Sequence, residues 1–204
     1  MSETAEKTLT LWRESWEKNG WEPVVLNEND AGRHPLYGEF SRAVQAFPSV
    51  NGPGFDYHAF MRWLASAQIV SETGWGIVTT EPDVINYSMD PESLRSLGIP
   101  SGKCLFLSPV PAMVLGDGFE RFCQAVIAHT LQPEDSFDGN PHLSDQDFAF
   151  RYGAGVVEFL GENRYCAEAF QGDRWKTSPC VHYATAYMIE NKCLPKHEHI
   201  PLLR

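Results

Sequence analysis

The chain has 204 residues and a formal charge of −11, with 43% aliphatic and aromatic residues and 21% charged residues. These proportions are those of a globular protein, and they exclude a disordered, collagenous or coiled-coil chain. A chain of this length can fold as one domain, residues 1–204, without disulfides or a metal. The negative charge excludes nonspecific binding to nucleic acid or to an anionic membrane, because both partners need clustered Lys and Arg.

The sequence indicates a cytoplasmic protein. Its longest apolar runs, such as residues 112–115, are far shorter than the ~20 residues that cross a bilayer. Glu3 and Glu6 stand where a secretory signal would carry basic residues. The five cysteines are odd in number and lack the short paired spacing of a zinc knuckle. We therefore expect reduced thiols.

Helices are expected where apolar residues recur at helical spacing, and strands where short apolar runs are bounded by Gly, Pro or polar residues. In chain order the expected elements are a helix at 5–19, a strand at 23–26, a helix at 36–47, a helix from 55 to 74, a strand at 76–79, a short helix after Asp90, strands at 104–107 and 112–115, a helix at 119–130, a polar loop at 132–143, a helix at 144–152, a strand at 155–160, and a helix or strand-to-helix corner at 181–191. This alternation predicts an α/β fold, a three-layer sheet flanked by helices.

Two acidic residues, Glu81 and Asp83, lie directly after the strand expected at 76–79. In an extended segment, residues i and i+2 project to the same side, so both carboxylates can face one divalent cation. Pro82 between them stiffens the turn. If the strand is central, its carboxyl end is where open α/β sheets bind substrates. The alternative interpretation is a surface turn, in which these residue types are common.

Several motifs follow one another in a recognisable order. They are a Trp-rich helix, the strand GWEPVVL, a helix ending in FMRW, a glycine-marked strand leading to the acidic pair, and then PVPAMVLG, SDQDF and VHY. This order resembles the DXD-containing glycosyltransferases with sugar-binding-motif domains, which include yeast-type initiating mannosyltransferases, bacterial capsular-polysaccharide glycosyltransferases and the catalytic domains of large clostridial toxins. The resemblance implies a nucleotide-diphospho-sugar transferase (GT-A-like) fold.

The resemblance also implies a metal-dependent enzyme that moves a hexose from a nucleotide-diphosphate sugar to a glycan or small acceptor. Mn²⁺ or Mg²⁺ would neutralise the leaving diphosphate, while the protein positions donor and acceptor. The implied residues are the metal ligands Glu81, Asp83 and His182, the donor-binding residues Arg62, His58 and Thr80, and the catalytic pair Asp145 and Asp147.

Structural interpretations of the same residues remain open. Ser144 and Asp147 have the spacing of a helix capping box, His182 is also compatible with a core histidine, and the tryptophans favour core packing. The chain lacks the family's first strand, and His58 and Ala59 replace a Ser-Asp pair. These departures favour a second hypothesis, a catalytically reduced scaffold or binding protein, and a second copy or another partner could supply the missing strand. A metal-dependent phosphohydrolase using the same acids is a third hypothesis.

Overall fold

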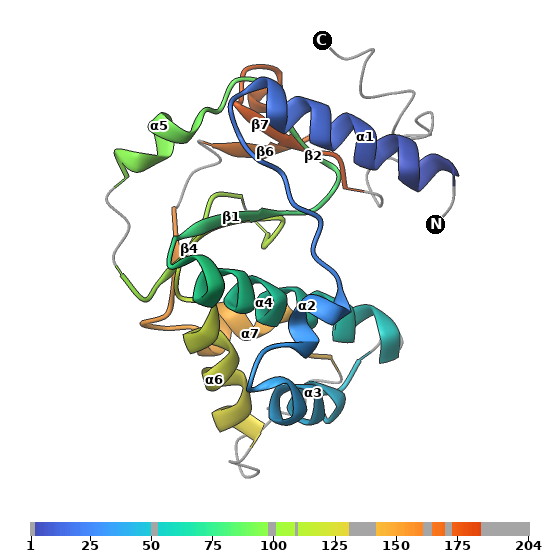
Figure 1. Cartoon of the computed structure of the whole chain (residues 1–204), viewed down its shortest axis with the longest axis vertical. Helices are drawn as coiled ribbons and strands as arrows, with labels where there is room; N and C mark the ends of the chain where they lie inside the picture. Colours follow the sequence, from blue (N-terminus) through green and yellow to red (C-terminus); the bar gives the residue numbers. More distant parts are fainter. Residues whose placement is uncertain are drawn as a thin grey trace.

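The computed structural model describes residues 3–49, 53–97, 101–108, 110–130, 142–160, 165–169 and 173–184 (Figure 1). Its helices are α1 (Glu3–Lys18), α2 (Glu28–Gly32), α3 (Tyr37–Gln45), α4 (Pro53–Thr73), α5 (Pro91–Arg95), α6 (Phe119–Thr130), α7 (Asp145–Tyr152) and the 3₁₀ turn η2 (Arg174–Lys176). Its strands are β1 (Ile77–Thr80), β2 (Val84–Asn86), β3 (Cys104–Phe106), β4 (Met113–Gly116), β5 (Val157–Phe159), β6 (Cys166–Glu168) and β7 (Cys180–His182).

The longer helices form where the apolar spacing predicts them, and one of them, α7, begins at a side-chain cap. The expected helices at 5–19, 36–47, 55–74, 119–130 and 144–152 correspond to α1, α3, α4, α6 and α7. Ser144 precedes α7 and accepts a hydrogen bond from the Asp147 backbone, while the Asp147 carboxylate accepts one from the Ser144 backbone. This reciprocal pair is a capping box. Asp90 caps the short helix α5 in a similar way by accepting from the Ser93 backbone.

The described strands form two small mixed sheets. The larger sheet has the order β1-β4-β3-β5, in which only β3 and β5 are parallel. The smaller sheet has the order β2-β7-β6, in which β2 and β7 are antiparallel and β6 and β7 are parallel. The mixed α/β class is therefore confirmed. The described residues do not show the single central sheet expected of a nucleotide-diphospho-sugar transferase fold, and β2 and β6 were not predicted.

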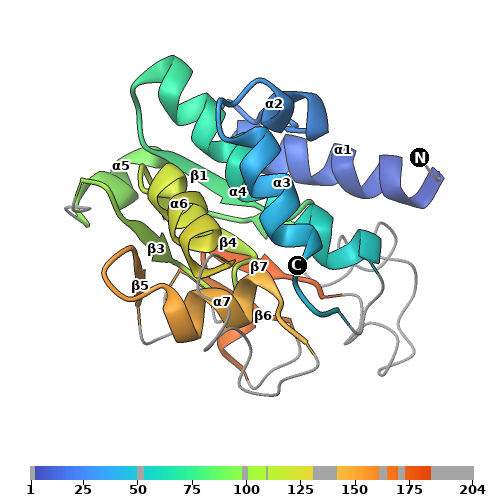
Figure 2. The ribbon, with the colours of Figure 1, turned by 90° about the horizontal axis from the view of Figure 1, so that it is seen from below.

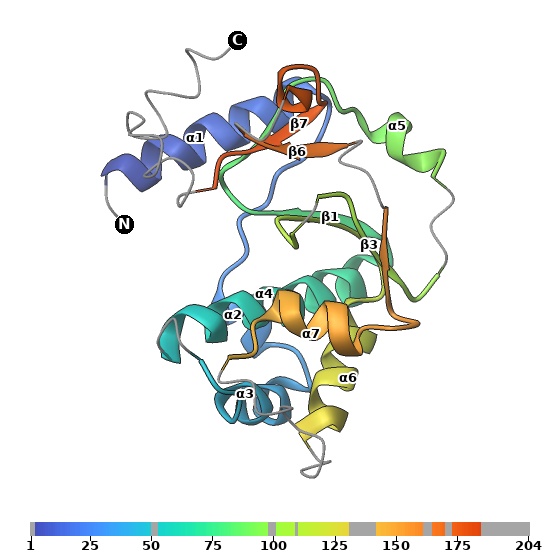
Figure 3. The same ribbon diagram turned by 180° about the vertical axis from the view of Figure 1, so that it is seen from behind.

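The four-stranded sheet separates two hydrophobic cores. Alternate side chains along a strand point to opposite faces. On β3, Cys104 and Phe106 belong to a core shared with α3, α4, α6 and α7, whereas Leu105 packs in the core shared with α1 and the smaller sheet. Helices α3, α4 and α6 cover the first face (Figure 2), and β6 and β7 lie beyond the second (Figure 3). The layers are thus helices, the larger sheet, and the smaller sheet with α1.

The strand predicted at residues 23–26 is wrong. Residues 21–27 form neither helix nor strand and run as an extended connection from α1 to α2 (Figure 1). Val24 is 61% exposed and Val25 is 44% exposed, so this Val-rich run is not a buried strand. Local β-propensity predicts a strand only where a neighbouring strand offers hydrogen-bond partners, and this connection pairs with none of the described strands.

Two other expectations are tested in part. The expected corner at 181–191 begins with the strand β7, and its helical part lies outside the described residues, as does most of the loop at 132–143.

The four cysteines within the described ranges, Cys104, Cys123, Cys166 and Cys180, are buried free thiols. None of the described helices is long and apolar enough to cross a bilayer.

Candidate metal centre

Glu81 and Asp83 lie where the chain passes from the larger sheet to the smaller one. Glu81 directly follows β1, and its backbone N–H donates to Ala112 O at 2.9 Å. Asp83 directly precedes β2, and Val84 N–H closes the turn by donating to Glu81 O at 3.1 Å. The prediction that both acids follow a strand is confirmed. The condition that this strand is central is not met among the described strands, because β1 lies at the edge of the order β1-β4-β3-β5.

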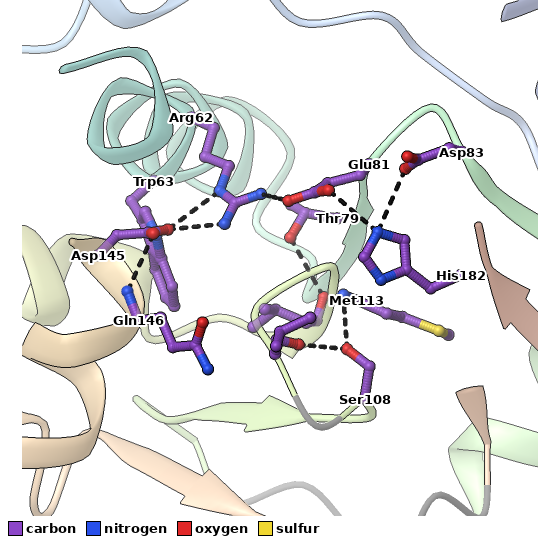
Figure 4. A network of polar contacts seen from close by, with 12 residues as sticks. Arg62, Trp63, Thr79, Glu81, Asp83, Ser108, Met113, Asp145, Gln146 and His182 are labelled. Atoms are coloured by element: carbon purple, nitrogen blue, oxygen red, sulfur yellow. Dashed lines mark hydrogen bonds and ion pairs between the residues drawn. The ribbon is translucent and has the colours of Figure 1, made fainter. Parts of the chain in front are cut away.

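His182 joins the two acids from β7. Val84 of β2 pairs with His182, so strand register brings the imidazole to residues that lie about 100 positions earlier in the chain. His182 Nε2 lies 3.3 Å from Glu81 Oε2 and 3.5 Å from Asp83 Oδ1 (Figure 4). One donor atom from each of the three residues lies within 4.8 Å of the other two. The predicted ligand set is therefore gathered in one place.

A third carboxylate, Glu168, lies on the opposite side of the imidazole. Glu168 on β6 is the register partner of His182 in the parallel β6–β7 pair, and its Oε1 lies 2.8 Å from His182 Nδ1. Both residues are only 5% exposed. A carboxylate at one imidazole nitrogen fixes the ring orientation and leaves the other nitrogen to a metal, an arrangement common among metal-ligating histidines. Glu168 is not among the residues predicted from the sequence.

The charges of the group hold His182 in its cationic form when no metal is bound. Burial alone would lower the pKa of His182, but hydrogen bonds with Glu168 and Glu81 and the charge of Asp83 outweigh it and raise the pKa to about 10. For Glu81, burial would raise the pKa, but contacts with His182 and Arg62 lower it to about 2. A metal ion at Nε2 would therefore have to displace a proton.

Arg62 connects this group to the helical layer. From α4, its Nη1 donates to Glu81 Oε1 at 2.6 Å, while its Nη2 and Nε donate to Asp145 Oδ2 at 2.7 and 3.2 Å (Figure 4). Burial would lower the pKa of Arg62, but Asp145 and Glu81 hold it above its ordinary value. Because Arg62 takes Oε1, the other oxygen of Glu81 faces His182. Glu81 thus bridges the arginine and the candidate metal position.

The two aspartates of the SDQDF segment have different surroundings. Asp145 is 4% exposed and accepts a hydrogen bond from Trp63 Nε1 at 2.8 Å in addition to its contacts with Arg62. Asp147 completes the capping box of α7, and its Oδ2 lies 3.8 Å from His142 Nε2. The structure therefore connects Asp145 to the cluster through Arg62 and places Asp147 at the helix terminus.

The remaining predicted donor-binding residues, His58 and Thr80, make contacts with residues outside the acidic cluster. His58 is exposed on α4, four positions before Arg62, and its ring packs edge-on against Tyr57 with 5.5 Å between centroids. Thr80 immediately precedes Glu81, and its Oγ1 accepts a hydrogen bond from Trp12 Nε1 at 2.8 Å. Thr80 therefore lies next to the cluster with its hydroxyl bonded to α1.

Comparison with known proteins adds no relative. No family model, curated protein or solved structure matches this chain. The choice of ion is therefore argued from the chemistry of the donor atoms. Two carboxylates suit Mg²⁺, Mn²⁺ and Zn²⁺, whereas an imidazole nitrogen suits transition metals better than Mg²⁺, which prefers oxygen ligands and retained water. The residues Glu81, Asp83 and His182 fit Mn²⁺ or Zn²⁺ best.

Proposed function

We propose that this chain is a metal-dependent enzyme. It would hold one divalent transition-metal ion through Glu81, Asp83 and His182. The observation that carries the proposal is the buried imidazole of His182, with Glu168 at one nitrogen and the two acids at the other. A core histidine needs only satisfied hydrogen bonds. Two further acids converging on Nε2 give the ligand number and mixture of a transition-metal site.

The charge of the surrounding group favours a cation. The group contains four acidic side chains, Glu81, Asp83, Asp145 and Glu168, and two basic ones, Arg62 and His182. Like charges held this close in a partly buried site repel one another by several kcal/mol at low effective dielectric. The excess of negative charge is therefore relieved by a divalent cation, and the same excess opposes an anionic ligand that arrives without one.

Among metal-dependent reactions, we propose the transfer of a hexose from a nucleotide-diphosphate sugar, to which the motif order points. In this role the ion would act as a Lewis acid toward the donor diphosphate. Glu81, Asp83 and His182 would hold the ion. Arg62, whose side chain is 30% exposed, would meet the anionic part of the donor, and Asp145 would keep the guanidinium in place.

The test compares metal and nucleotide binding in the wild type and Asp83→Asn. Thermal unfolding with Mn²⁺ or Zn²⁺ should show a rise in the wild type, because a ligand at a hundred times its dissociation constant adds about 2.7 kcal/mol. For a chain of this size that is roughly 5 to 10 °C. Asp83→Asn should lose the rise, whereas Asp173→Asn, on an exposed surface pair with Lys176, should keep it. A wild type that no divalent ion stabilises contradicts the metal site.

Nucleotides separate the enzymatic proposal from a second candidate, a catalytically reduced binding protein. Two observations favour that candidate. The described strands form two separate sheets instead of the single central sheet of a transferase, and a cavity of the protein lies away from the metal ligands. The cavity, about 190 Å³, is lined by residues such as Phe47, Asp56 and Phe60 rather than by the metal ligands. Small-molecule pockets usually enclose about 300–1,000 Å³. A further metal-dependent rise with UDP or GDP supports the transferase, and metal stabilisation without any nucleotide effect supports the binding protein.

A further inference from the structure

We propose that Trp12 and Trp16 of α1 are positioning residues that hold the metal-ligand turn, residues 81–83, in its binding geometry. The inference rests on the proposed metal site. The two indoles bond to the residues on either side of that turn, so α1 fixes both of its ends. Metal affinity should therefore depend on a helix that contributes no metal ligand.

The two indole hydrogen bonds enclose the turn. Trp12 Nε1 donates to Thr80 Oγ1 at 2.8 Å, and Thr80 immediately precedes Glu81. Trp16 Nε1 donates to Val84 O at 3.0 Å, and Val84 immediately follows Asp83. The donors are four residues apart, so they lie on one face of α1. Their exposed fractions are 8% and 3%.

Helix α1 also covers the outer edge of β2. Strand β2 is the edge strand of its sheet, and Asp83 O accepts from Tyr183 N–H on the β7 side. Successive carbonyls of a strand point to opposite edges, so Val84 O points away from β7, toward Trp16. Side chains at the end of α1 and just beyond it also bond both backbone groups of Asn86: Ser15 Oγ of α1 accepts from its N–H, and Asn19 Nδ2, directly after α1, donates to its O, each at 3.2 Å.

The arrangement has a consequence for the metal ligands. A metal site needs its ligands within a few tenths of an ångström of their positions, and a short turn between two edge strands has few backbone partners of its own. With α1 in place, β2 is bonded on both edges. Removing an indole N–H would leave Val84 O or Thr80 Oγ1 without that bond and let the turn relax, which weakens metal binding before it unfolds the protein.

Trp21 provides a matched control within the same packing. Its Nε1 donates to Met89 O at 2.8 Å, a tryptophan-to-carbonyl bond of the same kind as that of Trp16, and its ring packs edge-on against Trp16 with 5.5 Å between centroids. Met89 lies five residues beyond Val84, outside the metal-ligand turn. Trp21→Phe therefore removes an equivalent hydrogen bond and part of an equivalent side chain without touching either end of the turn.

The experiment measures Mn²⁺ affinity by calorimetry in the wild type, Trp12→Phe, Trp16→Phe and Trp21→Phe, at a temperature where circular dichroism shows all four folded. We expect Trp12→Phe and Trp16→Phe to weaken Mn²⁺ binding about threefold to tenfold, the fold-change of one lost hydrogen bond. Trp21→Phe should stay within about twofold while losing comparable thermal stability. Equal affinity in all three variants overturns the positioning role alone, whereas a wild type without Mn²⁺ binding overturns the proposed site as well.

A second measurement needs no variant. Because coupling is reciprocal, a bound metal should tighten the contacts that position its ligands. In ¹⁵N-labelled wild type, diamagnetic Zn²⁺ should slow exchange of the Trp12 and Trp16 indole hydrogens with D₂O by more than it slows that of Trp21. Equal slowing of all three indoles would mean general stabilisation and would overturn the inference.

Discussion

At the scale of single residues, His182 connects carboxylates that have two different roles. Glu81 and Asp83 face Nε2 and would be ligands, whereas Glu168 faces Nδ1 and sets which nitrogen carries a proton when the metal is bound. The two roles require different interactions of the carboxylate. A ligand must donate electrons directly to the ion, while Glu168 acts by accepting a hydrogen bond from the ring and raising its basicity.

Glu168→Gln should weaken binding of Mn²⁺ or Zn²⁺ about 10- to 100-fold, the range measured when such outer partners of metal-bound histidines are replaced. The amide keeps the shape but loses the charge, so the imidazole becomes a weaker ligand. Calorimetric titration measures the change. Glu158→Gln is the control, because Glu158 pairs with Lys103 at a distance from the cluster and should leave affinity unaltered. Equal effects of the two substitutions would contradict the assignment.

The metal-free protein should be most stable between about pH 4.5 and 6.5. The lowered pKa of Glu81, about 2 against 4.5, means that its contacts stabilise the fold above pH 4.5 and are lost as the pH falls toward 2. The raised pKa of His182, about 10 against 6.5, means that its contribution is complete below pH 6.5 and is lost as the pH rises toward 10.

Thermal unfolding in EDTA across this range checks both limbs. The decline above pH 6.5 should flatten in His182→Gln, because the substituted side chain does not titrate. The decline below pH 4.5 has contributions from other carboxylates and should flatten only in part in Glu81→Gln. An unchanged alkaline decline in His182→Gln would show that another group causes it.

The sequence permits some of these residues to be predicted and not others. Glu81 and Asp83 follow from local spacing after a strand. His182 comes only from the resemblance, since no local pattern distinguishes a ligand from a core histidine. Glu168 was missed because its partner lies 14 residues away across a parallel strand pair. Its one sequence signal is an acid within a run of small buried residues, Cys166, Ala167 and Ala169, where an unpaired charge would be costly.

At the scale of elements, periodicity identifies the long helices but not every short strand. Helices α1, α4 and α6 span three or more turns, which is enough for an apolar stripe to repeat. Strands β2 and β6 have three residues each and were not predicted, whereas β3 and β5, which are equally short, lie within the strands expected at 104–107 and 155–160. Strands β2 and β6 form because β7 lies between them. Residues 23–26 show the opposite case, because they have high β-propensity but no described strand beside them with which to pair.

Helix α7 gives a prediction about Asp145. Asp145→Asn should destabilise the protein by roughly 2–3 kcal/mol, below the ~3–5 kcal/mol of a fully buried broken pair, because Arg62 keeps its bond to Glu81 and is 30% exposed. Ser144→Ala, which removes only the cap of the same helix, should cost about 1 kcal/mol. Urea unfolding with equal m-values measures both. A smaller loss in Asp145→Asn than in Ser144→Ala would contradict a structural role for Asp145.

At the scale of the whole molecule, one chain of polar contacts crosses from the helical layer to the smaller sheet. In order, its members are Trp63, Asp145, Arg62, Glu81 and His182, which Figure 4 labels, and then Glu168. Trp63 packs in the helical core, and β6 and β7 border the other core. The metal site therefore lies where the two cores meet, so neither core alone can position all three ligands.

The two cores should unfold as one cooperative unit, as expected of a single domain over residues 1–204. They share the larger sheet, whose β3 places Phe106 in one core and Leu105 in the other, and such a shared layer couples their stabilities. Phe122→Ala tests this from the helical side, because Phe122 is fully buried and stacks on Trp63 with 3.8 Å between ring centroids. The substitution should cost about 3–5 kcal/mol.

Phe122→Ala should destabilise the layer of α1 and the smaller sheet as much as the helical layer. Hydrogen exchange followed by mass spectrometry in increasing urea should show α1 and β2 losing protection at the same concentration as α4 and α6, in the wild type and, at a lower concentration, in Phe122→Ala. If only the helical core shifted, the layers would be separate folding units. The ligands would then be gathered by contact between two independent bodies, and metal affinity would fall with the stability of that contact rather than with the fold.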